Sequence, residues 1–390
     1  MPGPILVAAG GTGGHLFPAE ALALALAGRG WRIHLATDRR VESYGRDFPA
    51  EKIHFIPSAT LTRQPLEAAG AILNIGAGVV LSRILIARER PAAAVGFGGY
   101  PTVPPMLAAT WAKVPTIVHE QNAVLGRANR FLAPRVDRIA TSVPELAGAG
   151  SLQAKVVQTG NPVRPVVRDL AATPYPARGT ADPFRLLVFG GSQGARVFSD
   201  LVPAAVALMA KEVQGRLRVV QQCRPEDIAR VRQAYDLLGV TADLAPFFAD
   251  LPKRIADAHL VVARSGASTC TELAVIGRPS ILVPLPHALE QDQKANAGVL
   301  AAAGGAWMID QAELTPARLA ADIARLVAEP ERLAKAAAAA RSLGRPDAVD
   351  RLADLVEEVA GNAAAPTSSL SGKGNGRSHA PAGSGRGGSP

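Results

Sequence analysis

Two glycine-rich loops, at matching places in the two halves of the chain, constrain the fold more than any other feature. The apolar run Ile5–Ala8 leads into Gly10–Gly14 (GGTGG) and then into an Ala/Leu-rich helical pattern. The run Arg185–Phe189 leads into Gly190–Ala195 (GGSQGA) and a second helical pattern. A strand, a glycine turn and a helix start bring backbone N–H groups and the positive end of a helix dipole against a phosphate. One such loop is also explained by a tight turn without a ligand, but two favour two successive phosphate-binding α/β halves.

Short apolar runs alternate with longer helical patterns, which is typical of a parallel α/β sheet. Predicted strands cover Ile5–Ala8, Arg32–Ala36, Ala92–Val95, Thr116–Val118 and Arg138–Thr141 in the first half, and Arg185–Phe189, Arg218–Gln221, Leu260–Ala263 and Ser280–Val283 in the second. We expect a first domain over residues 1–165, a proline-rich linker over 166–183 and a second domain over 184–345. A last helix over 346–360 is expected to pack back on the first domain. The Gly/Ser/Ala/Pro-rich residues 361–390 are expected to be disordered.

Positive charge is concentrated in the first half. Residues 1–165 contain 17 Lys and Arg against 10 Asp and Glu, whereas residues 166–360 contain 22 against 23. This asymmetry predicts an anionic partner for the first half. The two cysteines, Cys223 and Cys270, match no metal-binding spacing and favour a reducing compartment. The N-terminus has no basic n-region and is expected to form the first strand, not a signal peptide.

The most membrane-like segment runs from Ala68 to Ser82 and is followed by Arg83. It is shorter than the roughly 18–20 residues that a spanning helix needs, so we expect no transmembrane helix. Two interpretations remain open. The segment is either a patch whose apolar side chains enter the headgroup region beside arginines that meet anionic lipid, or a buried α/β helix with solvated arginines. The apolar residues concerned are Ile72, Leu73, Ile75, Val79, Val80, Leu81, Ile84 and Leu85, and the arginines are Arg83, Arg88 and Arg90.

Two further loops strengthen the ligand-binding interpretation. Gly96–Tyr100 follows the predicted strand Ala92–Val95, and Arg264–Thr269 follows Leu260–Ala263. All four loops lie at the carboxyl ends of predicted strands, where α/β sheets bind ligands. Arg264–Thr269 also offers hydroxyl groups and the free N–H groups of a helix start, which suit a diphosphate.

A nicotinamide dehydrogenase is the first alternative. The sequence Gly11–Gly14 followed by Asp38 partly fits the dinucleotide fingerprint. That interpretation leaves the second glycine loop unexplained. A P-loop is absent, because no Gly-Lys-Ser/Thr follows either glycine cluster.

Seven motifs, in order over roughly residues 3–360, resemble the MurG family of peptidoglycan N-acetylglucosaminyltransferases, in glycosyltransferase family 28. They are Gly10–His15, Gly98–Tyr100, His119–Asn122, Gly160–Arg164, Gly190–Ala195, Arg264–Ala267 and Asp292–Ala297. The resemblance implies the GT-B fold, in which two Rossmann-like domains with parallel sheets face each other across a cleft. It also implies inverting transfer of GlcNAc from UDP-GlcNAc to the C4 hydroxyl of MurNAc in undecaprenyl-diphosphoryl-MurNAc-pentapeptide (lipid I), which gives lipid II.

The resemblance also implies the donor contacts. These are Thr12, Gly13, Gly14, Asn122 and Arg164 in the first half, and Ser192, Phe248 (through its backbone), Ala267, Ser268, Thr269, Cys270, Thr271, Glu272 and Gln293 in the second. Ser192 and the N–H groups of Ser268 and Thr269 suit a diphosphate whose charge grows as UDP departs.

Glu272 can accept hydrogen bonds from ribose hydroxyls, and Gln293 can bond sugar hydroxyls. The alternatives are a first-turn helix charge for Glu272 and a solvated amide for Gln293. The segment from His287 to Gln293 is one residue longer than in the family form, with Asp292 where a second Gln is common, so the role of Asp292 stays open.

The reaction needs a base for the acceptor hydroxyl. His15 ends the first glycine loop and is the favoured candidate, with a capping or packing role as the alternative. His119 and Glu120 are rivals at the end of another strand. No Asp-x-Asp sequence occurs, so the metal arrangement of GT-A enzymes is missing. We expect no metal or cofactor, with helix N-termini stabilising the leaving group instead.

We expect Gly98, Gly99 and Tyr100 to meet the acceptor diphosphate, and Ile72, Ile75, Val79 and Arg83 to meet the membrane. The expected partners are UDP-GlcNAc, lipid I and an anionic membrane surface, with other cell-wall and division proteins as further partners and no nucleic acid. The expected location is peripheral, on the cytoplasmic face of the bacterial inner membrane. Rival hypotheses are a UDP-GlcNAc 2-epimerase, a glycolipid glycosyltransferase, and a nucleotide-sugar-binding scaffold without turnover.

Overall fold

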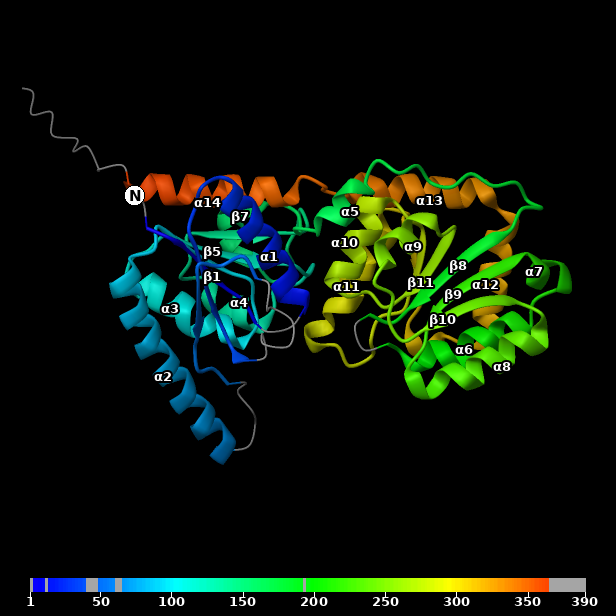
Figure 1. Cartoon of the computed structure of the whole chain (residues 1–390), viewed down its shortest axis with the longest axis horizontal. Coiled ribbons are helices and arrows are strands. Elements are labelled where there is room, and N and C mark those ends of the chain that lie inside the picture. The colour runs from blue at the N-terminus through cyan, green and yellow to red at the C-terminus, as the bar shows by residue number, and fades with distance from the viewer. Residues whose placement is uncertain (1–2, 11–12, 40–47, 60–64, 192–193, 365–390) are drawn as a thin grey trace, which may run out of the picture.

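The computed structural model describes residues 3–10, 13–39, 48–59, 65–191 and 194–364. The chain forms two α/β halves, each with a parallel sheet covered by helices (Figure 1). Thr12 and Ser192, two expected donor contacts, lie outside the described residues, as does the tail over 365–390.

The first half is built on a seven-stranded parallel sheet with the order β3-β2-β1-β4-β5-β6-β7. Its strands are β1 (Ile5–Ala8), β2 (Ile33–Thr37), β3 (Lys52–Phe55), β4 (Ala93–Gly96), β5 (Thr116–Glu120), β6 (Arg138–Thr141) and β7 (Val156–Gln158). Its helices are α1 (Gly13–Gly28), α2 (Pro65–Glu89), α3 (Val103–Trp111) and α4 (Arg127–Leu132). The sequence prediction missed the two edge strands, β3 and β7. Both are short and only partly buried, so neither has the continuous apolar run of a central parallel strand.

The second half is built on a six-stranded parallel sheet with the order β10-β9-β8-β11-β12-β13. Its strands are β8 (Phe184–Phe189), β9 (Leu217–Gln222), β10 (Thr241–Ala245), β11 (Leu260–Ala263), β12 (Ser280–Leu282) and β13 (Ala306–Met308). Its helices are α6 (Arg196–Ala207), α7 (Lys211–Arg216), α8 (Ile228–Leu238), α9 (Leu251–Asp257), α10 (Ala267–Ile276), α11 (Asp292–Ala302), α12 (Pro316–Ala328) and α13 (Pro330–Leu343). Here too the strands that the prediction missed, β10 and β13, are the two edges.

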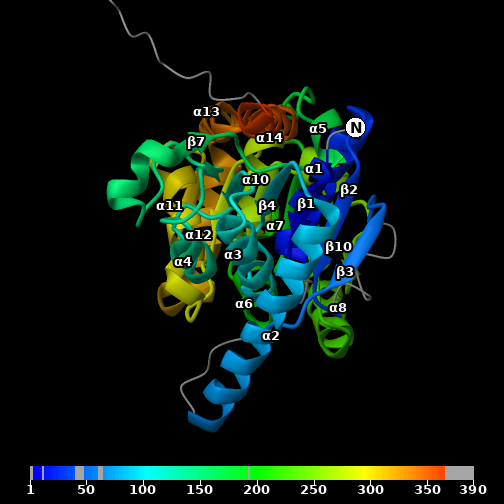
Figure 2. The same cartoon turned by 90° about the vertical axis from the view of Figure 1, so that its left-hand side faces the viewer.

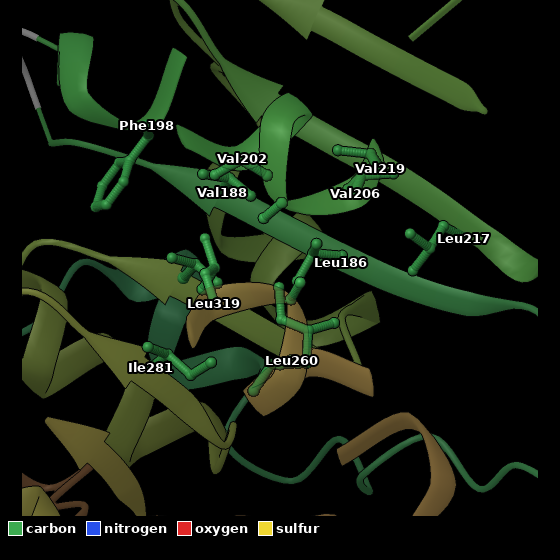
Figure 3. Close-up of a cluster of buried hydrophobic side chains, with 14 of the residues drawn as sticks. Leu186, Val188, Phe198, Val202, Val206, Leu217, Val219, Leu260, Ile281 and Leu319 are labelled. Atoms are coloured by element: carbon green, nitrogen blue, oxygen red, sulfur yellow. The ribbon is translucent and has the colours of Figure 1, made fainter. Parts of the chain in front are cut away.

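One face of the second sheet shows how the core forms (Figure 3). The helix α6 places Phe198, Val202 and Val206 at four-residue intervals, so all three meet the sheet on one helical face. They pack with Leu186 and Val188 of the central strand β8. Full burial of each such side chain contributes about 1.5–3 kcal/mol. The core therefore fixes β8, whose carboxyl end carries a glycine loop.

The last helix, α14 (Ala348–Ala364), packs on the first half although it follows the second half in sequence (Figure 1). Its apolar face joins the core of the first sheet through Leu352 and Val356. On its polar side, Arg29 Nη1 lies 2.7 Å from carboxylate oxygens of both Asp354 and Glu357. The chain thus crosses between the halves twice, near residue 165 and near residue 345.

The segment over 166–183, expected to be a linker, is bound to the second half. It begins with α5 (Pro165–Asp169), whose Val167 is buried against that half. The buried Arg278 donates to the carbonyl of Pro174 at 2.9 Å, and the hydroxyl of Tyr175 donates to the carbonyl of His259 at 2.9 Å. Beyond α5 the prolines exclude regular structure, but long-range hydrogen bonds hold the segment in place.

The helix α2 projects beyond the rest of the first half (Figures 1 and 2). By length and composition alone, its stretch Gly70–Glu89 is apolar enough to cross a membrane, with a mean hydropathy of 1.8 and 28% burial. The sequence prediction ended the apolar segment at Ser82 because Arg83 follows, but the helix continues to Glu89. The same test is also passed by core helices of soluble proteins, so the burial pattern of α2 is the more informative observation.

Burial divides α2 into two faces. Val79 and Ile86 pack in the core of the first half, next to α3. Another face exposes apolar side chains, namely Leu73 (75%), Val80 (58%), Leu81 (46%) and Ile84 (60%). Ile72 is also exposed (61%), although it lies seven residues before Val79 and so on the same side of the helix. The expectation that Val79 meets a membrane is therefore wrong, because Val79 is 8% exposed and points into the protein. Ile75 is half-buried at the edge of that core.

Candidate active site

The four glycine loops of the sequence follow four particular strands. In the first sheet, β1 and β4 are neighbours, and the strand order runs outward from them in both directions. In the second sheet, β8 and β11 occupy the same place. Such reversals of strand order open a crevice at the carboxyl edge, where α/β proteins bind ligands. The loops after β1, β4, β8 and β11 are those predicted from the glycines, so in each half two glycine loops flank the reversal of strand order.

The two carboxyl edges meet through a buried amide network centred on Asn296 of α11. Its Oδ1 accepts from the backbone N–H of Ala123 at 2.8 Å, and its Nδ2 donates to Oδ1 of Asn122 at 3.0 Å. The same Nδ2 also donates to the carbonyl of Ser265 at 3.2 Å. Asn296 thus joins a loop of the first half to the loop after β11. Asn296 lies within the motif Asp292–Ala297, but no role was predicted for it from the sequence.

A partly buried ion pair also joins the halves. Arg164 Nη2 lies 3.2 Å from Oε1 of Glu272, and the guanidinium group lies 5.6 Å from the ring centre of Phe17. Burial raises the pKa of the Glu272 carboxyl, against the lowering effect of the Arg164 charge. Arg164 and Glu272, two expected donor contacts from opposite halves, are therefore brought together. The Glu272 carboxylate is already paired with the Arg164 guanidinium.

The long loop before α11 makes a second ionic contact between the halves. Glu290 accepts from Arg127 Nε at 2.8 Å and from Arg130 Nη2 at 3.2 Å, both on α4. These hydrogen bonds lower the pKa of the Glu290 carboxyl. Glu290 and Gln291 have φ of 57° and 53°, a region that non-glycine residues rarely occupy.

A cavity of about 70 Å³ lies between the halves behind these contacts. It is lined by Asn161 and Ser142 of the first half, by Cys270 and Ala274 of α10, and by Arg345 of the connection to α14. Burial raises the pKa of the Cys270 thiol to about 12. The expectation that Cys270 contacts the donor is not supported, because its buried side chain faces this cavity.

The N-terminus of α10 presents the best phosphate-binding geometry of the second half. Gly266 is its extended N-cap, and the N–H groups of Ala267, Ser268 and Thr269 begin the helix. The first N–H groups of a helix have no acceptor within the helix, and the dipole favours an anion there. Thr271 points elsewhere, since its hydroxyl accepts from Asn161 Nδ2 at 3.1 Å. A run of six helical residues cannot all face one ligand, which explains why Cys270 and Thr271 face the other half.

Gln293 supports the loop after β11. Its Oε1 accepts from the N–H of Leu285 at 3.0 Å and from that of Ser265 at 3.3 Å. Its amide nitrogen remains available to donate to a ligand. Phe248 is buried under the guanidinium of Arg254 at 4.2 Å from the ring centre, so its side chain is not open to a ligand and the backbone contact stays a prediction. The carboxylate of Asp292 accepts from the N–H of Gln293 at 2.7 Å, and burial raises the pKa of Asp292.

The first-half crevice is centred on His15, in the first turn of α1, which begins at Gly13 and Gly14. Its Nδ1 lies 3.2 Å from Oε1 of Gln121. Gly98 and Gly99 pass beside the ring with φ of 87° and 79°, and a Cβ on either would lie within 3.5 Å of an imidazole atom. The two glycines therefore allow the half-buried ring to sit at the end of β4.

His119 and Glu120 are poorly placed to act as the base. His119 is fully buried, its Nε2 lies 2.9 Å from the carbonyl of Gly160, and burial lowers its pKa to about 4. Glu120 is 2% exposed, and its carboxylate accepts four hydrogen bonds. The donors are the N–H and Nδ2 of Asn122, the N–H of Gly126 and Nδ2 of Asn129. Both residues hold the loops together. Among the described residues, His15 is bonded through Nδ1 only, which leaves its Nε2 for a substrate.

The side-chain amide of Gln222 also supports a glycine loop, and it was not predicted from the sequence. Gln222, at the end of β9, accepts from the N–H of Gly190 at 3.0 Å and donates to the carbonyl of Gly191 at 2.9 Å. Like Gln121, it lies at the end of a strand next to a glycine loop. Nothing local in the sequence distinguishes it from other strand-end residues. Throughout the described ranges, no group of three or more His, Cys, Asp or Glu side chains is arranged to hold a metal ion.

Comparison with known protein families gives matches to both halves. The glycosyltransferase family 28 N-terminal domain matches residues 5–141, and the family 28 C-terminal domain matches residues 185–352. A Rhodopseudomonas palustris protein named UDP-N-acetylglucosamine--N-acetylmuramyl-(pentapeptide) pyrophosphoryl-undecaprenol N-acetylglucosamine transferase is 57% identical over 359 residues, covering 91% of this chain and 98% of that protein. A protein of the same name from Methylobacterium nodulans is 58% identical over 360 residues, covering 91% and 96%.

Solved structures agree on the architecture. The crystal structure of Acinetobacter baumannii MurG is similar with a TM-score of 0.74 at 26% identity, covering 91% of this chain and 99% of that chain. A UDP-GlcNAc 2-epimerase from Neisseria meningitidis, solved bound to UDP-GlcNAc, has a TM-score of 0.64 at 15% identity, covering 91% and 100%. The second similarity concerns the fold alone.

Proposed function

The chain belongs to glycosyltransferase family 28, and on this basis we propose that it transfers GlcNAc from UDP-GlcNAc to the C4 hydroxyl of MurNAc in undecaprenyl-diphosphoryl-MurNAc-pentapeptide. The observation that supports this most is the contact between the carboxyl edges of the two sheets, through Asn296 and through Arg164 with Glu272. One edge offers the N-terminus of α10, and the other offers the imidazole of His15. The N-terminus of α10 suits the diphosphate of the donor, and the imidazole of His15 suits the hydroxyl of the acceptor.

The reaction proceeds by direct displacement with inversion. The C4 oxygen of the acceptor forms a bond to C1 of GlcNAc on the face opposite UDP, and its proton passes to Nε2 of His15. The bond between C1 and the β-phosphate oxygen breaks, and UDP leaves with that electron pair. The N–H groups of Ala267, Ser268 and Thr269 meet the charge that develops on the leaving diphosphate.

Donor specificity comes from side chains of the second half. Glu272 accepts hydrogen bonds from the ribose hydroxyls of UDP, and Gln293 donates from its free amide nitrogen to a GlcNAc hydroxyl. Arg164, paired with Glu272 in this structure, lies within reach of the donor from the first half. Gly98, Gly99 and Tyr100 meet the diphosphate of the lipid acceptor.

Membrane contact is part of the proposed function. The exposed face of α2 inserts Leu73, Val80, Leu81 and Ile84 into the headgroup region, together with the exposed Ile72, and Arg83 meets anionic lipid. The protein is accordingly peripheral, on the cytoplasmic face of the inner membrane, where an undecaprenyl-linked acceptor is accessible. Cell-wall and division proteins are further proposed partners.

Polar substitution on this face tests the membrane contact. We expect a Leu73→Gln, Val80→Gln, Ile84→Gln variant to lose at least tenfold in partitioning onto vesicles containing phosphatidylglycerol, because three apolar side chains no longer leave water. Cosedimentation measures the partitioning, with circular dichroism as the check on folding. The matched control is Leu208→Gln with Leu237→Gln, two exposed leucines of the second half. Equal loss in the control, or none in the α2 variant, would contradict the proposal.

A direct assay tests the reaction itself. Purified protein with UDP-GlcNAc and a short-chain lipid I analogue should release UDP and form a disaccharide-lipid, detected by mass spectrometry. Conversion of UDP-GlcNAc without an acceptor would instead indicate a 2-epimerase. Donor binding without either product would indicate a nucleotide-sugar-binding scaffold.

A further inference from the structure

A continuous set of hydrogen bonds runs from His15 into the core of the first half. His15 Nδ1 lies 3.2 Å from Gln121 Oε1, and Gln121 Nε2 lies 3.2 Å from His119 Nδ1. Gln121 Nε2 also donates to the carbonyl of Phe97 at 2.9 Å. The set ends where His119 Nε2 meets the carbonyl of Gly160 at 2.9 Å. Gln121 and His119 are 4% and 0% exposed, so water does not compete for these contacts.

The protons of this set can be placed from its fixed ends. The carbonyl of Gly160 only accepts, so His119 must carry its proton on Nε2. Burial lowers the pKa of His119 to about 4, so the ring is neutral near pH 7 and its Nδ1 is an acceptor. The group of Gln121 that faces His119 must then be the NH2 group. The carbonyl of Phe97, which also only accepts, independently requires the same orientation.

The orientation of Gln121 determines the proton position on His15. With its NH2 group directed to Phe97 and His119, Gln121 presents only its carbonyl oxygen to His15. The His15 nitrogen that faces it must therefore be a donor, Nδ1–H. In a neutral imidazole the lone pair then lies on Nε2, and no residue of the described ranges is hydrogen-bonded to that atom.

We propose that Gln121 is a positioning residue that holds His15 in the tautomer with its lone pair on Nε2, ready to take a proton from the acceptor hydroxyl. This inference rests on the proposed function of His15 as the base. The role resembles that of a group which orients a catalytic histidine through its other ring nitrogen, but here a neutral amide and a buried second histidine replace a carboxylate.

The groups that the structure places around the His15 ring are uncharged. The loop after β4 contributes Gly98 and Gly99, and the loop after β1 contributes Gly10. At the end of β5, His119 is neutral, and the Glu120 carboxylate is directed to Asn122, Gly126 and Asn129. Across the part of the chain that the structure describes, His15 forms no ion pair with a carboxylate, and its side-chain partner is Gln121. Gln121 is therefore the group that selects the tautomer without adding charge.

Nitrogen-15 NMR of the unaltered full chain tests the proposal without any substitution. Long-range proton–nitrogen correlations distinguish a protonated ring nitrogen from an unprotonated one. We expect Nδ1 of His15 to be protonated and Nε2 unprotonated, and the reverse pattern would overturn the proposal. The measurement needs no transferase activity, so its result is distinguishable from a failure of the proposed reaction.

Two variants of Gln121 then test its role in turnover. Gln121→Met removes the acceptor, so the other tautomer of His15 becomes populated and kcat falls about tenfold while KM for UDP-GlcNAc is kept. Gln121→Glu keeps an acceptor but adds charge that stabilises the imidazolium, so the acid limb of the kcat–pH profile moves to higher pH. A packing role alone would not move that limb.

Gln222→Met is the matched control, since Gln222 is also a buried amide that supports a glycine loop. We expect the His15 nitrogen signals to be unchanged in this control. An unchanged tautomer in Gln121→Met, or an unmoved acid limb in Gln121→Glu, would each overturn the proposal.

Discussion

Replacing His15 with alanine is expected to lower kcat by roughly 10²- to 10⁴-fold, the usual contribution of a general base. The substitution removes the ring whose Nε2 is free to take the acceptor proton, while the contacts of α10 with the donor are untouched. The dissociation constant of UDP-GlcNAc should therefore change by less than about threefold. Steady-state kinetics with a short-chain lipid I analogue measure the first quantity, and calorimetric titration measures the second.

A second substitution separates the base from the packing of the ring. His15→Asn keeps an N–H donor that can reach toward Gln121 but has no basic nitrogen, so its loss of kcat should equal that of His15→Ala. If His15→Asn retained near-normal turnover, His15 would be a packing residue. His119 and Glu120 are not useful alternatives in this experiment, because both are buried and their loss would disrupt the loops that they hold.

Replacing Glu272 with alanine is expected to raise the KM for UDP-GlcNAc by about 100-fold or more. Each hydrogen bond from a ribose hydroxyl to a carboxylate contributes about 1.5–3 kcal/mol, and the variant loses two of them. It also leaves the guanidinium of Arg164 without its partner at the interface between the halves. In Glu272→Gln the amide carbonyl oxygen remains as one hydrogen-bond acceptor. The KM of this variant for UDP-GlcNAc should therefore lie between that of the parent protein and that of Glu272→Ala.

The nucleotide itself provides the control for Glu272. The parent protein should bind UDP more tightly than 2′-deoxy-UDP, and Glu272→Ala should bind the two equally, as competition against UDP-GlcNAc would show. Glu290→Ala removes a different ion pair between the halves and should keep the discrimination. If Glu272→Ala still preferred UDP, Glu272 would only be a helix-terminus charge.

The internal repeat of glycine loops was sufficient to predict the fold class. Central strands such as β1 and β8 are fully or almost fully buried, so their sequences are continuous apolar runs that can be read directly. The edge strands β3 and β10 pair on one side only and are partly exposed, so their sequences resemble loops. The prediction therefore found the middle of each sheet and missed its edges.

The site divides in the same way. Backbone features of the site, such as Gly98 and the start of α10 at Ala267, depend on local geometry that a short motif determines. The direction of a side chain depends on neighbours far along the chain. Val79 and Ile84 look alike in sequence, yet α3 covers one and leaves the other exposed.

By itself, the sequence determined the two α/β halves and the four glycine loops at strand ends, because glycine turns and apolar runs act over a few residues. Only the tertiary structure decided which candidate base keeps a free nitrogen. His15 lies in the first turn of α1 and His119 near the end of β5. The carbonyl of Gly160, 41 residues away, is bonded to the ring of His119, and Gln121, 106 residues away, is bonded to the ring of His15. Contacts at such separations arise from the order of strands in the sheet, which no local pattern encodes.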